Sequence, residues 1–292
     1  MNYAVVTPVR DEHENLERLA DCMTAQTVRP QQWVIVDNGS VDETPALARS
    51  LAETHDWISV TTAEPDSVAR PGAPIVRAFN AGVAALGTEL PDVIVKLDAD
   101  ISMSDDHFER VLAAFADDPR LGITGGTCLE LQDGEWRETY VTGDHVRGAA
   151  RCYRRECLAA VSPLVERLGW DGLDELKAST LGWKTRLLRD APVKHHRRVG
   201  ERDGASTTRW RRQGEGAYFM GYRFNYLVLR SLHHARRHPS ALAMIQGYVA
   251  SAARRDERYD DPAVRAYLRD QQRLLRIGSR FREAGGRRQT AG

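Results

Sequence analysis

Residues 91–101 read PDVIVKLDADI, an apolar run that ends in two carboxylates. The β-branched side chains of 93–97 predict a buried strand. Asp98 and Asp100 follow this run one residue apart, and in an extended chain such positions point the same way. Two acids so placed repel each other unless a cation or hydrogen-bond donors lie between them, and carboxylate oxygens suit Mg²⁺ or Mn²⁺. The pair therefore predicts a metal site where the strand ends, although such pairs also occur in ordinary solvated turns.

The composition is that of an ordinary globular protein. Of the 292 residues, 42% are hydrophobic and 28% are charged, and the formal net charge is zero. No apolar run is long enough to cross a bilayer. We expect no nucleic-acid partner, because no overall positive field would attract one. A chain of this length can hold one large domain and an appendage.

The cysteines and the N-terminus bear on the compartment. Cys22, Cys128, Cys152 and Cys157 have neither a metal-finger nor a redox CxxC spacing. The N-terminus lacks a signal-peptide pattern. We therefore expect a cytoplasmic protein with reduced cysteines.

Short β-branched runs alternate with amphipathic runs in the first half of the chain. The predicted strands are 3–7, 33–36, 58–62 and 93–97, and the predicted helices are 15–24, 44–53, 74–86 and 104–117. This alternation is typical of the α/β class, with a mostly parallel sheet covered by helices. Ligands of such sheets bind outside the carboxyl ends of the strands. Because Thr7, Asp37 and Asp98 stand at three of these ends, we expect them along one edge.

Four motifs resemble those of the family-2 glycosyltransferases, which have the Rossmann-like GT-A fold. Residues 7–44 contain a similar helix start, a Gln-Thr before the second strand, and a Val-Asp-x-Gly-Ser-x-Asp-x-Thr turn. RAFNAGVAAL at 77–86 is similar to a helix of the family, and LDAD at 97–100 resembles its Asp-x-Asp signature. The likeness spans about residues 3–200.

The resemblance implies an enzyme that moves a sugar from a UDP- or GDP-sugar to an acceptor hydroxyl with inversion, assisted by Mg²⁺ or Mn²⁺. The implied acceptor is a carbohydrate or a lipid-linked compound in polysaccharide, glycolipid or glycoconjugate synthesis. The cation would be held by Asp98 and Asp100 and would stabilise the departing diphosphate as a Lewis acid. The implied donor contacts are Thr7, Pro8, Arg10, Glu12, Asp37, Asn38, Gly39, Arg77, Asn80, Lys96, Asp98 and Ala99.

Inverting transfer also needs a base for the proton of the acceptor. The family carries a Glu-Asp pair, one further residue and Asp-Leu at the place of 169–177, which here reads GWDGLDELK. Because the spelling differs, the base stays open among three acids. We expect Asp171, in the loop before a helix, then Asp174, then Glu175. The alternative is that Asp171 only caps the helix.

A basic cluster follows a predicted short strand at 191–193. His195 and His196 are adjacent, so only one of them can face the site from a strand. A neutral imidazole can complete a metal site, and we favour His195 as this ligand. The neighbours Arg197 and Arg198 could instead grip the diphosphate. A plain surface cluster is the alternative.

The region between these features and the last hundred residues carry weaker signals. A hairpin is predicted at 132–135. Side chains nearby that could contact a sugar are Trp136, Tyr140, Asp144 and His145. We expect a catalytic domain at 1–205, with a donor half to about 100 and an acceptor half beyond it, a helical region at 206–284 and a disordered tail at 285–292. The aromatic and basic helices could lie on an anionic membrane, pack on the domain or form a homodimer.

Two other functions fit the sequence less well than sugar transfer. A sugar-phosphate nucleotidylyltransferase would need a glycine-rich phosphate loop after the first strand, and residues 8–15 contain no glycine. A non-catalytic module that binds a nucleotide sugar or a partner would keep the fold and lose the acids. The presence of Asp98, Asp100 and Asp171 argues against that module.

Overall fold

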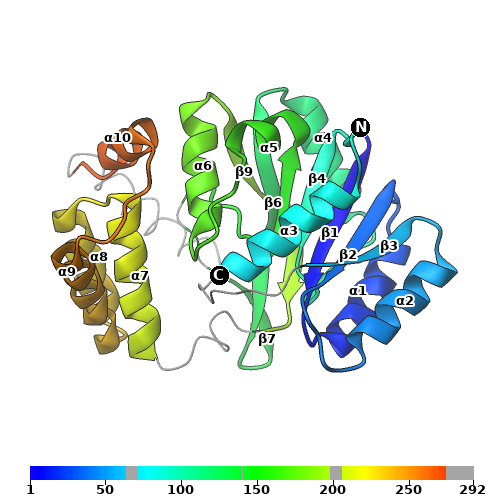
Figure 1. Ribbon diagram of the computed structural model, residues 1–292, viewed down its shortest axis with the longest axis horizontal. Coiled ribbons are helices and arrows are strands. Elements are labelled where there is room, and N and C mark those ends of the chain that lie inside the picture. The colour runs from blue at the N-terminus through cyan, green and yellow to red at the C-terminus, as the bar shows by residue number, and fades with distance from the viewer. Residues whose placement is uncertain (64–71, 140, 142, 198–205, 274–292) are drawn as a thin grey trace. The chain divides into compact units, whose positions relative to one another are not determined.

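The computed structural model describes residues 1–63, 72–139, 141, 143–197 and 206–273 (Figure 1). The chain divides into two compact units, Met1–Arg198 and Val199–Gly292. The predicted domain boundary at 205 falls at the edge of a stretch outside the described residues, and the predicted tail at 285–292 lies wholly outside them. The domain boundaries and the disorder of the tail therefore stay predictions.

The first unit alternates strands with helices. Its first part consists of β1 (Tyr3–Val9), α1 (His13–Thr24), β2 (Gln32–Asp37), α2 (Thr44–Thr54), β3 (Ile58–Thr62), α3 (Ala73–Ala85) and β4 (Val93–Leu97). It continues with β5 (Ile101–Met103), α4 (His107–Asp117), β6 (Leu121–Gln132), β7 (Glu135–Glu138), β8 (Ala150–Arg154), α5 (Arg155–Val161), α6 (Trp170–Thr180) and β9 (Lys184–His195). The predicted α/β class is confirmed.

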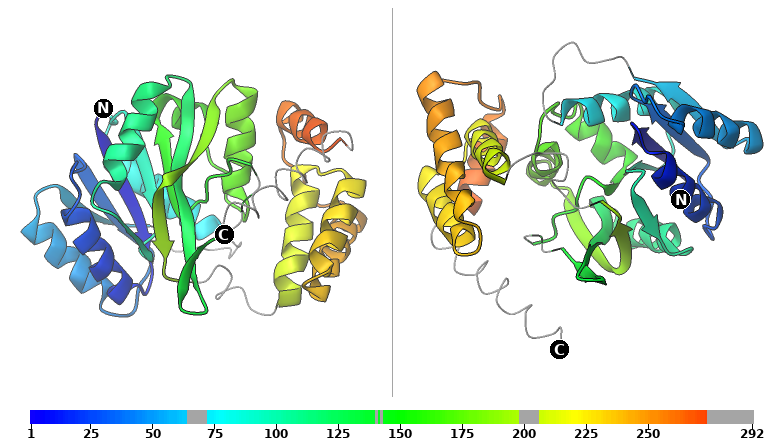
Figure 2. Two further views of the ribbon diagram at one scale, coloured as in Figure 1. Left: turned by 180° about the vertical axis from the view of Figure 1, so that it is seen from behind. Right: turned by 90° about the horizontal axis from the view of Figure 1, so that it is seen from below.

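One mixed sheet joins these strands (Figure 2). Its order is β3-β2-β1-β4-β8-β6-β9-β5, and β7 pairs with β6. β1 is parallel to both of its neighbours, with Val9 opposite Asp37 on β2 and Val6 opposite Lys96 on β4. The carboxyl ends of these three strands therefore lie along one edge, as the sequence predicts.

Successive side chains of the central strands enter different cores, as the pleat of a strand requires. Val5 and Val95 pack with α1, α2 and α4 on one face of the sheet. Val6 and Ile94 pack with α3, α5 and α6 on the other. A methyl group on Gly82 of α3 would lie 2.3 Å from Cγ1 of Val6, so a glycine lets this helix approach the sheet.

The structure changes the bounds of two predicted elements and confirms the predicted hairpin. The helix expected from residue 104 begins at His107, because the hydroxyl of Ser104 donates to the side chain of Asp106. The short strand expected at 191–193 is the end of the long β9. The hairpin at 132–135 is confirmed, and Asp133 and Gly134 both have the positive φ of a tight turn.

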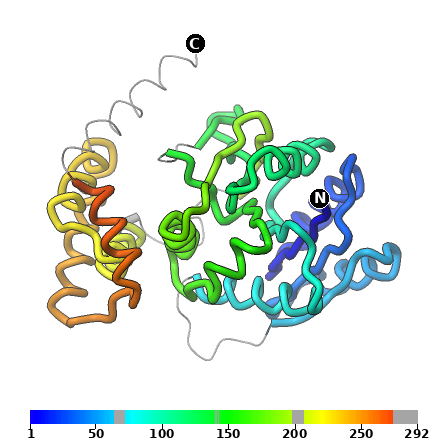
Figure 3. Tube along the Cα trace, turned by 90° about the horizontal axis from the view of Figure 1, so that it is seen from above, coloured from blue at the N-terminus to red at the C-terminus, as the bar shows by residue number. Residues whose placement is uncertain are grey.

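The second unit is helical. It consists of α7 (Ser206–Met220), α8 (Phe224–Ala235), η2 (Pro239–Leu242), α9 (Ala243–Arg254) and α10 (Pro262–Gln271). Trp210, Leu227 and Met244 belong to its own core. α7 and α9 lie side by side (Figure 3), and a methyl group on Gly214 would lie 1.9 Å from the carbonyl oxygen of Met244. Among the described residues, no helix has the length and apolar character that a membrane span requires.

Candidate active site

The Asp-x-Asp acids lie in a turn rather than in a strand. β4 ends at Leu97, so the expected alternation of a strand does not extend to Asp98 and Asp100. The amide of Asp98 donates to the carbonyl of Ala149 at 2.7 Å. The two acids are still close enough that the charge of Asp100 helps burial to raise the pKa of Asp98.

Lys96 supplies a positive charge to this turn. Its ammonium group forms an ion pair with Asp98, and its side chain is only 1% exposed. The ammonium group also lies 5.8 Å from the centre of the Trp170 ring at the start of α6. A buried lysine of this kind must have a partner, because an isolated ammonium group is costly in the interior. Lys96 and the buried Ala99 therefore support the turn from within the core.

Asp100 lies beside His195, because β5 pairs with the end of β9 and places Ile101 opposite His195. Nε2 of His195 is 3.4 Å from Oδ2 of Asp100. Burial would lower the pKa of His195, but the hydrogen bond and charge of Asp100 outweigh burial and raise it. Oδ1 of Asp100 and Nδ1 of His195 are buried and have no hydrogen-bond partner among the described residues. His196 faces elsewhere, with its ring 2.7 Å from the Ser102 hydroxyl.

Arg197 connects this pair to the first strand. It forms two hydrogen bonds with the carboxylate of Glu12, at 2.7 and 2.6 Å, and lies 3.7 Å from Oδ2 of Asp100. Glu12 is buried and precedes α1. Arg198 and Tyr140, two further predicted contacts, lie outside the described residues.

Hydrogen bonds join the loop after β1 to the loop after β2. The amide of Val41 donates to Asp11, and the amide of Asp11 donates to the Ser40 hydroxyl. Asp37 accepts a hydrogen bond from the Ser40 amide at 3.1 Å. The left-handed φ of 78° at Gly39 permits the tight turn between them.

The other predicted donor contacts divide by exposure. Thr7 is buried and its hydroxyl accepts a hydrogen bond from the Trp33 indole, so its side chain is not presented to a ligand. Pro8, near the end of β1, and Asn38, after β2, are half-buried, and Arg10, after β1, is exposed. On α3, Arg77 pairs with Glu166 at 2.7 Å, and Asn80 is exposed.

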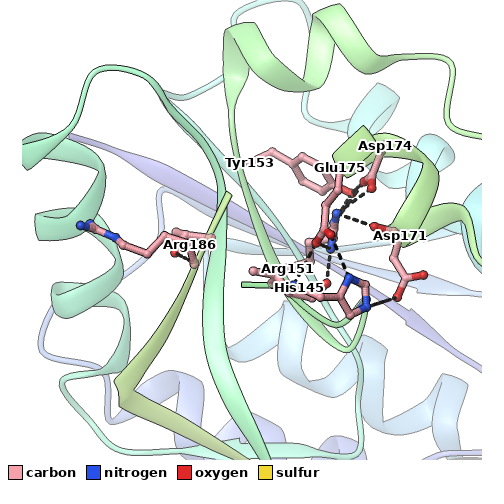
Figure 4. A network of polar contacts seen from close by, with 10 residues as sticks. His145, Arg151, Tyr153, Asp171, Asp174, Glu175 and Arg186 are labelled. Carbon is pink, nitrogen blue, oxygen red and sulfur yellow. Dashed lines mark hydrogen bonds and ion pairs between the residues drawn. The ribbon is translucent and has the colours of Figure 1, made fainter. Parts of the chain in front are cut away.

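A second acidic centre lies at the start of α6, where Asp171, Asp174 and Glu175 surround Arg151 of β8 (Figure 4). Arg151 is fully buried and bonds Asp174 at 2.6 Å and Glu175 at 3.0 Å. The Tyr153 hydroxyl also donates to Asp174, whose side chain is only 2% exposed. Burial raises the pKa of Asp174 to about 7, against the opposing charge of Arg151. The structure thus places Asp174 in a buried ion pair.

Asp171 occupies the more open side of this centre. It lies in the first turn of α6, one residue past the start of the helix, where the sequence predicted a loop. Its side chain is 26% exposed, and Oδ2 accepts a hydrogen bond from the Gly148 amide at 3.1 Å. Nε2 of His145 lies 3.8 Å from the same oxygen. Glu175 uses one oxygen for the ring of His145 and the other for the Val146 amide.

Sequence reasoning missed Arg151 and the ion pair of Glu130 with Arg147. The pair is joined at 2.9 Å, and Glu130 lies opposite His195 in the sheet. One signal was present: Arg151 interrupts the apolar run GAARCY, and a charge inside a buried strand requires a partner. The partner itself lies 23 residues away on a helix, where no local pattern points to it.

The donor set for a cation is small. Among the described residues, no group of three or more His, Cys, Asp or Glu side chains is arranged to hold a metal ion. Asp100 and His195 lie 3.4 Å apart, and each has a buried atom with no hydrogen bond to a described residue, which fits a cation ligand. Mg²⁺ commonly takes only one or two protein ligands and completes its shell with phosphates and water.

Comparisons with known proteins bear on the fold and on the family resemblance. Residues 4–147 match the family model described as Glycosyl transferase family 2. No curated protein sequence matches the chain significantly.

Many solved structures resemble the chain, and three of them illustrate the likeness. Mannosyltransferase PcManGT from Pyrobaculum calidifontis, in complex with GDP-Man and Mn²⁺, has a TM-score of 0.57 at 15% identity, covering 95% of this chain and 87% of that one. Glucosyl-3-phosphoglycerate synthase from Mycobacterium tuberculosis, in complex with Mn²⁺, UDP and its product, has a TM-score of 0.52 at 16% identity, covering 72% and 79%. Residues 1–349 of S. aureus TarS give 0.53 at 16% identity, covering 73% and 64%.

At these identities the structural likeness establishes the fold alone. The predicted GT-A fold is confirmed by these neighbours, and the family model matches through the acidic turn to the loop before β8. The predicted resemblance to the family-2 glycosyltransferases is therefore confirmed over residues 4–147.

Proposed function

We propose that the protein is an inverting glycosyltransferase that moves a sugar from a UDP- or GDP-sugar to an acceptor hydroxyl, with Asp171 as the general base. One observation carries the proposal. Two successive residues, Gly148 and Ala149, form hydrogen bonds to both acidic centres. The amide of Gly148 donates to the Asp171 carboxylate, and the carbonyl of Ala149 accepts from the Asp98 amide. A base and a diphosphate site this close are what a single displacement requires.

Exposure and bonding select the base among the three candidate acids. Asp174 is committed to Arg151 and Tyr153, and both oxygens of Glu175 are bonded to the segment before β8 or to Arg151. Asp171 has the most exposed side chain of the three and keeps Oδ1 without a hydrogen bond to any described residue. Its Oδ1 is therefore available to take the proton of the acceptor.

His145 and the Gly148 amide hold the other oxygen of the base. Burial would lower the pKa of His145, but the hydrogen bond with Glu175 and the charges of Glu175 and Asp171 raise it. His145 and the Gly148 amide thus fix the direction of the Asp171 carboxylate.

Asp100 and His195 would hold a divalent cation, Mg²⁺ or Mn²⁺, with the donor diphosphate completing its shell. Their unpartnered buried oxygen and nitrogen support this assignment. Such a cation, when bound, supplies Lewis-acid stabilisation of the charge on the leaving diphosphate. Asp98, paired with Lys96, lies next to this site, and we propose it as a donor contact.

The remaining proposed donor contacts lie at the ends of β1 and β2 and on the hydrogen-bonded loops that follow them. We propose that Asp37, Asn38 and Gly39 with Pro8 and Arg10 receive the nucleoside. Glu12 and Arg197 support this region by their paired hydrogen bonds. The acceptor is a carbohydrate or a lipid-linked compound, and the four cysteines, all free thiols, fit a cytosolic enzyme.

The test separates binding from chemistry. Asp171→Asn should keep the thermal stabilisation by UDP- or GDP-sugars with Mn²⁺ and lose release of the nucleoside diphosphate by at least 1,000-fold, roughly the scale of removing a catalytic group. Asp117→Asn, at the exposed end of α4, is the matched control and should behave as the unmodified protein. Normal turnover by Asp171→Asn would refute the base. Absence of stabilisation by every nucleotide sugar tested would refute the donor class.

A further inference from the structure

The second unit exposes an unusual share of large apolar side chains. Ten such side chains are exposed in the described chain, and half of them lie within residues 224–249 of this unit. They are Phe224, Leu229, Leu232, Leu242 and Val249. Scattered exposed apolar residues are normal, whereas a concentration on one helical unit indicates an interaction surface.

α8 places this apolar character opposite its packed side. Leu227 and Ser231 are fully buried, whereas Leu229 is 41% and Leu232 is 49% exposed. Residues two positions apart on a helix point in nearly opposite directions, so the two exposed leucines share the outer face. Arg236, one turn beyond Leu232, continues the same face.

Charge is distributed as unevenly as apolar surface. Residues 206–255 contain nine arginines and one acid, Glu215. The first unit has ten more acidic than basic side chains, and the second has ten more basic than acidic ones. Arg236 and Arg237 at the end of α8 are exposed and have no acidic partner among the described residues.

We propose that the outer face of α8, defined by Leu229, Leu232, Arg236 and Arg237, docks on an anionic phospholipid surface. Guanidinium groups bind phosphate through paired hydrogen bonds, and leucines gain free energy only where an apolar layer receives them. A membrane interface presents phosphate groups next to an apolar layer, within the diameter of one helix. Amphipathic helices with basic flanks bind at such interfaces. A soluble polyanion would use the arginines and leave the leucines in water.

A second copy of the chain is a poorer occupant of this face. A symmetric dimer brings identical patches together, and here both patches carry exposed arginines that repel each other. The inference concerns where the protein acts and goes beyond the proposed transfer. Its test measures binding alone, so it can fail while the proposed chemistry stands.

The experiment is co-flotation of the full chain with vesicles. Equal mixtures of phosphatidylglycerol and phosphatidylcholine should bind the protein, and phosphatidylcholine alone should not. Leu229→Ser with Leu232→Ser should weaken binding more than about tenfold, from the lost apolar burial. Arg236→Gln with Arg237→Gln should weaken it about 25-fold, at about fivefold for each charge. Leu168→Ser with Leu181→Ser, two exposed leucines of the first unit at 44% and 54%, is the matched control and should bind fully.

Each remaining outcome counts against the proposal. Equal binding by the leucine variant and the unmodified protein would mean that a plain polyanion suffices. Loss of binding in the control variant would place the surface elsewhere. A dimer that the leucine variant dissociates, without vesicle binding, would assign the face to a second copy. If circular dichroism shows that the leucine variant is unfolded, the arginine variant, which changes only exposed side chains, tests the proposal in its place.

Discussion

His145 lies beside Asp171, with Nε2 of the imidazole 3.8 Å from Oδ2 of the carboxylate. The other ring nitrogen is 2.9 Å from Glu175, so the ring is held between two acids of one helix turn. The orientation of the proposed base therefore depends on a residue in the segment before β8. Loss of the ring should therefore affect the proposed transfer and spare donor binding.

His145→Gln should lower kcat by about 10- to 100-fold, because the Asp171 carboxylate loses the ring that fixes its direction. The affinity for the donor should not change. His55→Gln, between α2 and β3, is the control. An unchanged kcat in His145→Gln would show that the ring does not position the base.

Asp174→Asn should destabilise the fold by about 3–5 kcal/mol, because it leaves Arg151 buried without its main counter-charge. The measurement is urea unfolding at pH 8, where the Asp174 carboxyl, with its pKa of about 7, is ionised. Asp171→Asn should cost less than about 1 kcal/mol, since its side chain is partly exposed. Equal losses in the two variants would contradict the separate structural and chemical roles.

Removal of either proposed metal ligand should abolish stabilisation by Mn²⁺. In the presence of UDP or GDP, Mn²⁺ should raise the Tm of the unmodified protein, because a ligand of the native state stabilises it. Asp100→Ala and His195→Ala should each lose that rise. His196→Ala should keep it, because this ring contacts Ser102 and Trp136 instead. Retention of the rise in Asp100→Ala would place the ion elsewhere.

Two glycines should respond to alanine in opposite ways. A methyl group at Gly126 would lie 1.9 Å from the carbonyl oxygen of Ala191, where β6 and β9 pair, and should cost about 2–4 kcal/mol. A methyl group at Gly172 on α6 would meet nothing within 4 Å. Gly172→Ala should therefore stabilise the fold by about 0.5–1 kcal/mol. Thermal unfolding of both variants checks the contrast.

Buried His107 should make the fold sensitive to acid. Burial lowers its pKa from 6.5 to about 4, so its proton binds the unfolded chain more tightly than the folded one. The resulting stability is complete above pH 6.5 and is lost as the pH falls towards 4, amounting to about 3 kcal/mol. His107→Leu should lose that much less stability over the same range. Identical pH dependence in the two proteins would refute the assignment.

The sequence predicts the alternation of strands and helices and the edge where β1, β2 and β4 end. It succeeds because β-branched runs such as 93–97 and their spacing are local properties. It also predicts that only one of His195 and His196 faces the acids, since neighbours in a strand point in opposite directions. The structure places His195, the favoured one, beside Asp100. The start of α6 was misplaced, because Asp171 resembles a cap and lies instead inside the first turn.

Asp98 is paired with Lys96, only two residues before it, and the predicted cation between Asp98 and Asp100 stays a prediction. The partner of Asp174, by contrast, could not be predicted from local patterns. Asp174 looks like an accessible acid of a helix start and is buried by Arg151, which reaches it across the fold. Such pairs depend on tertiary packing, which one sequence does not reveal.

The many bonds of Arg151 limit how this enzyme can change over evolutionary time. Its guanidinium group also bonds the carbonyls of Val146 and Asp171, so one side chain fixes the loop, the helix start and the inner acid together. A substitution at any of these positions disturbs the others at once. New acceptor preferences should therefore arise from replacements at loop positions outside this network, while the network itself is inherited as a unit.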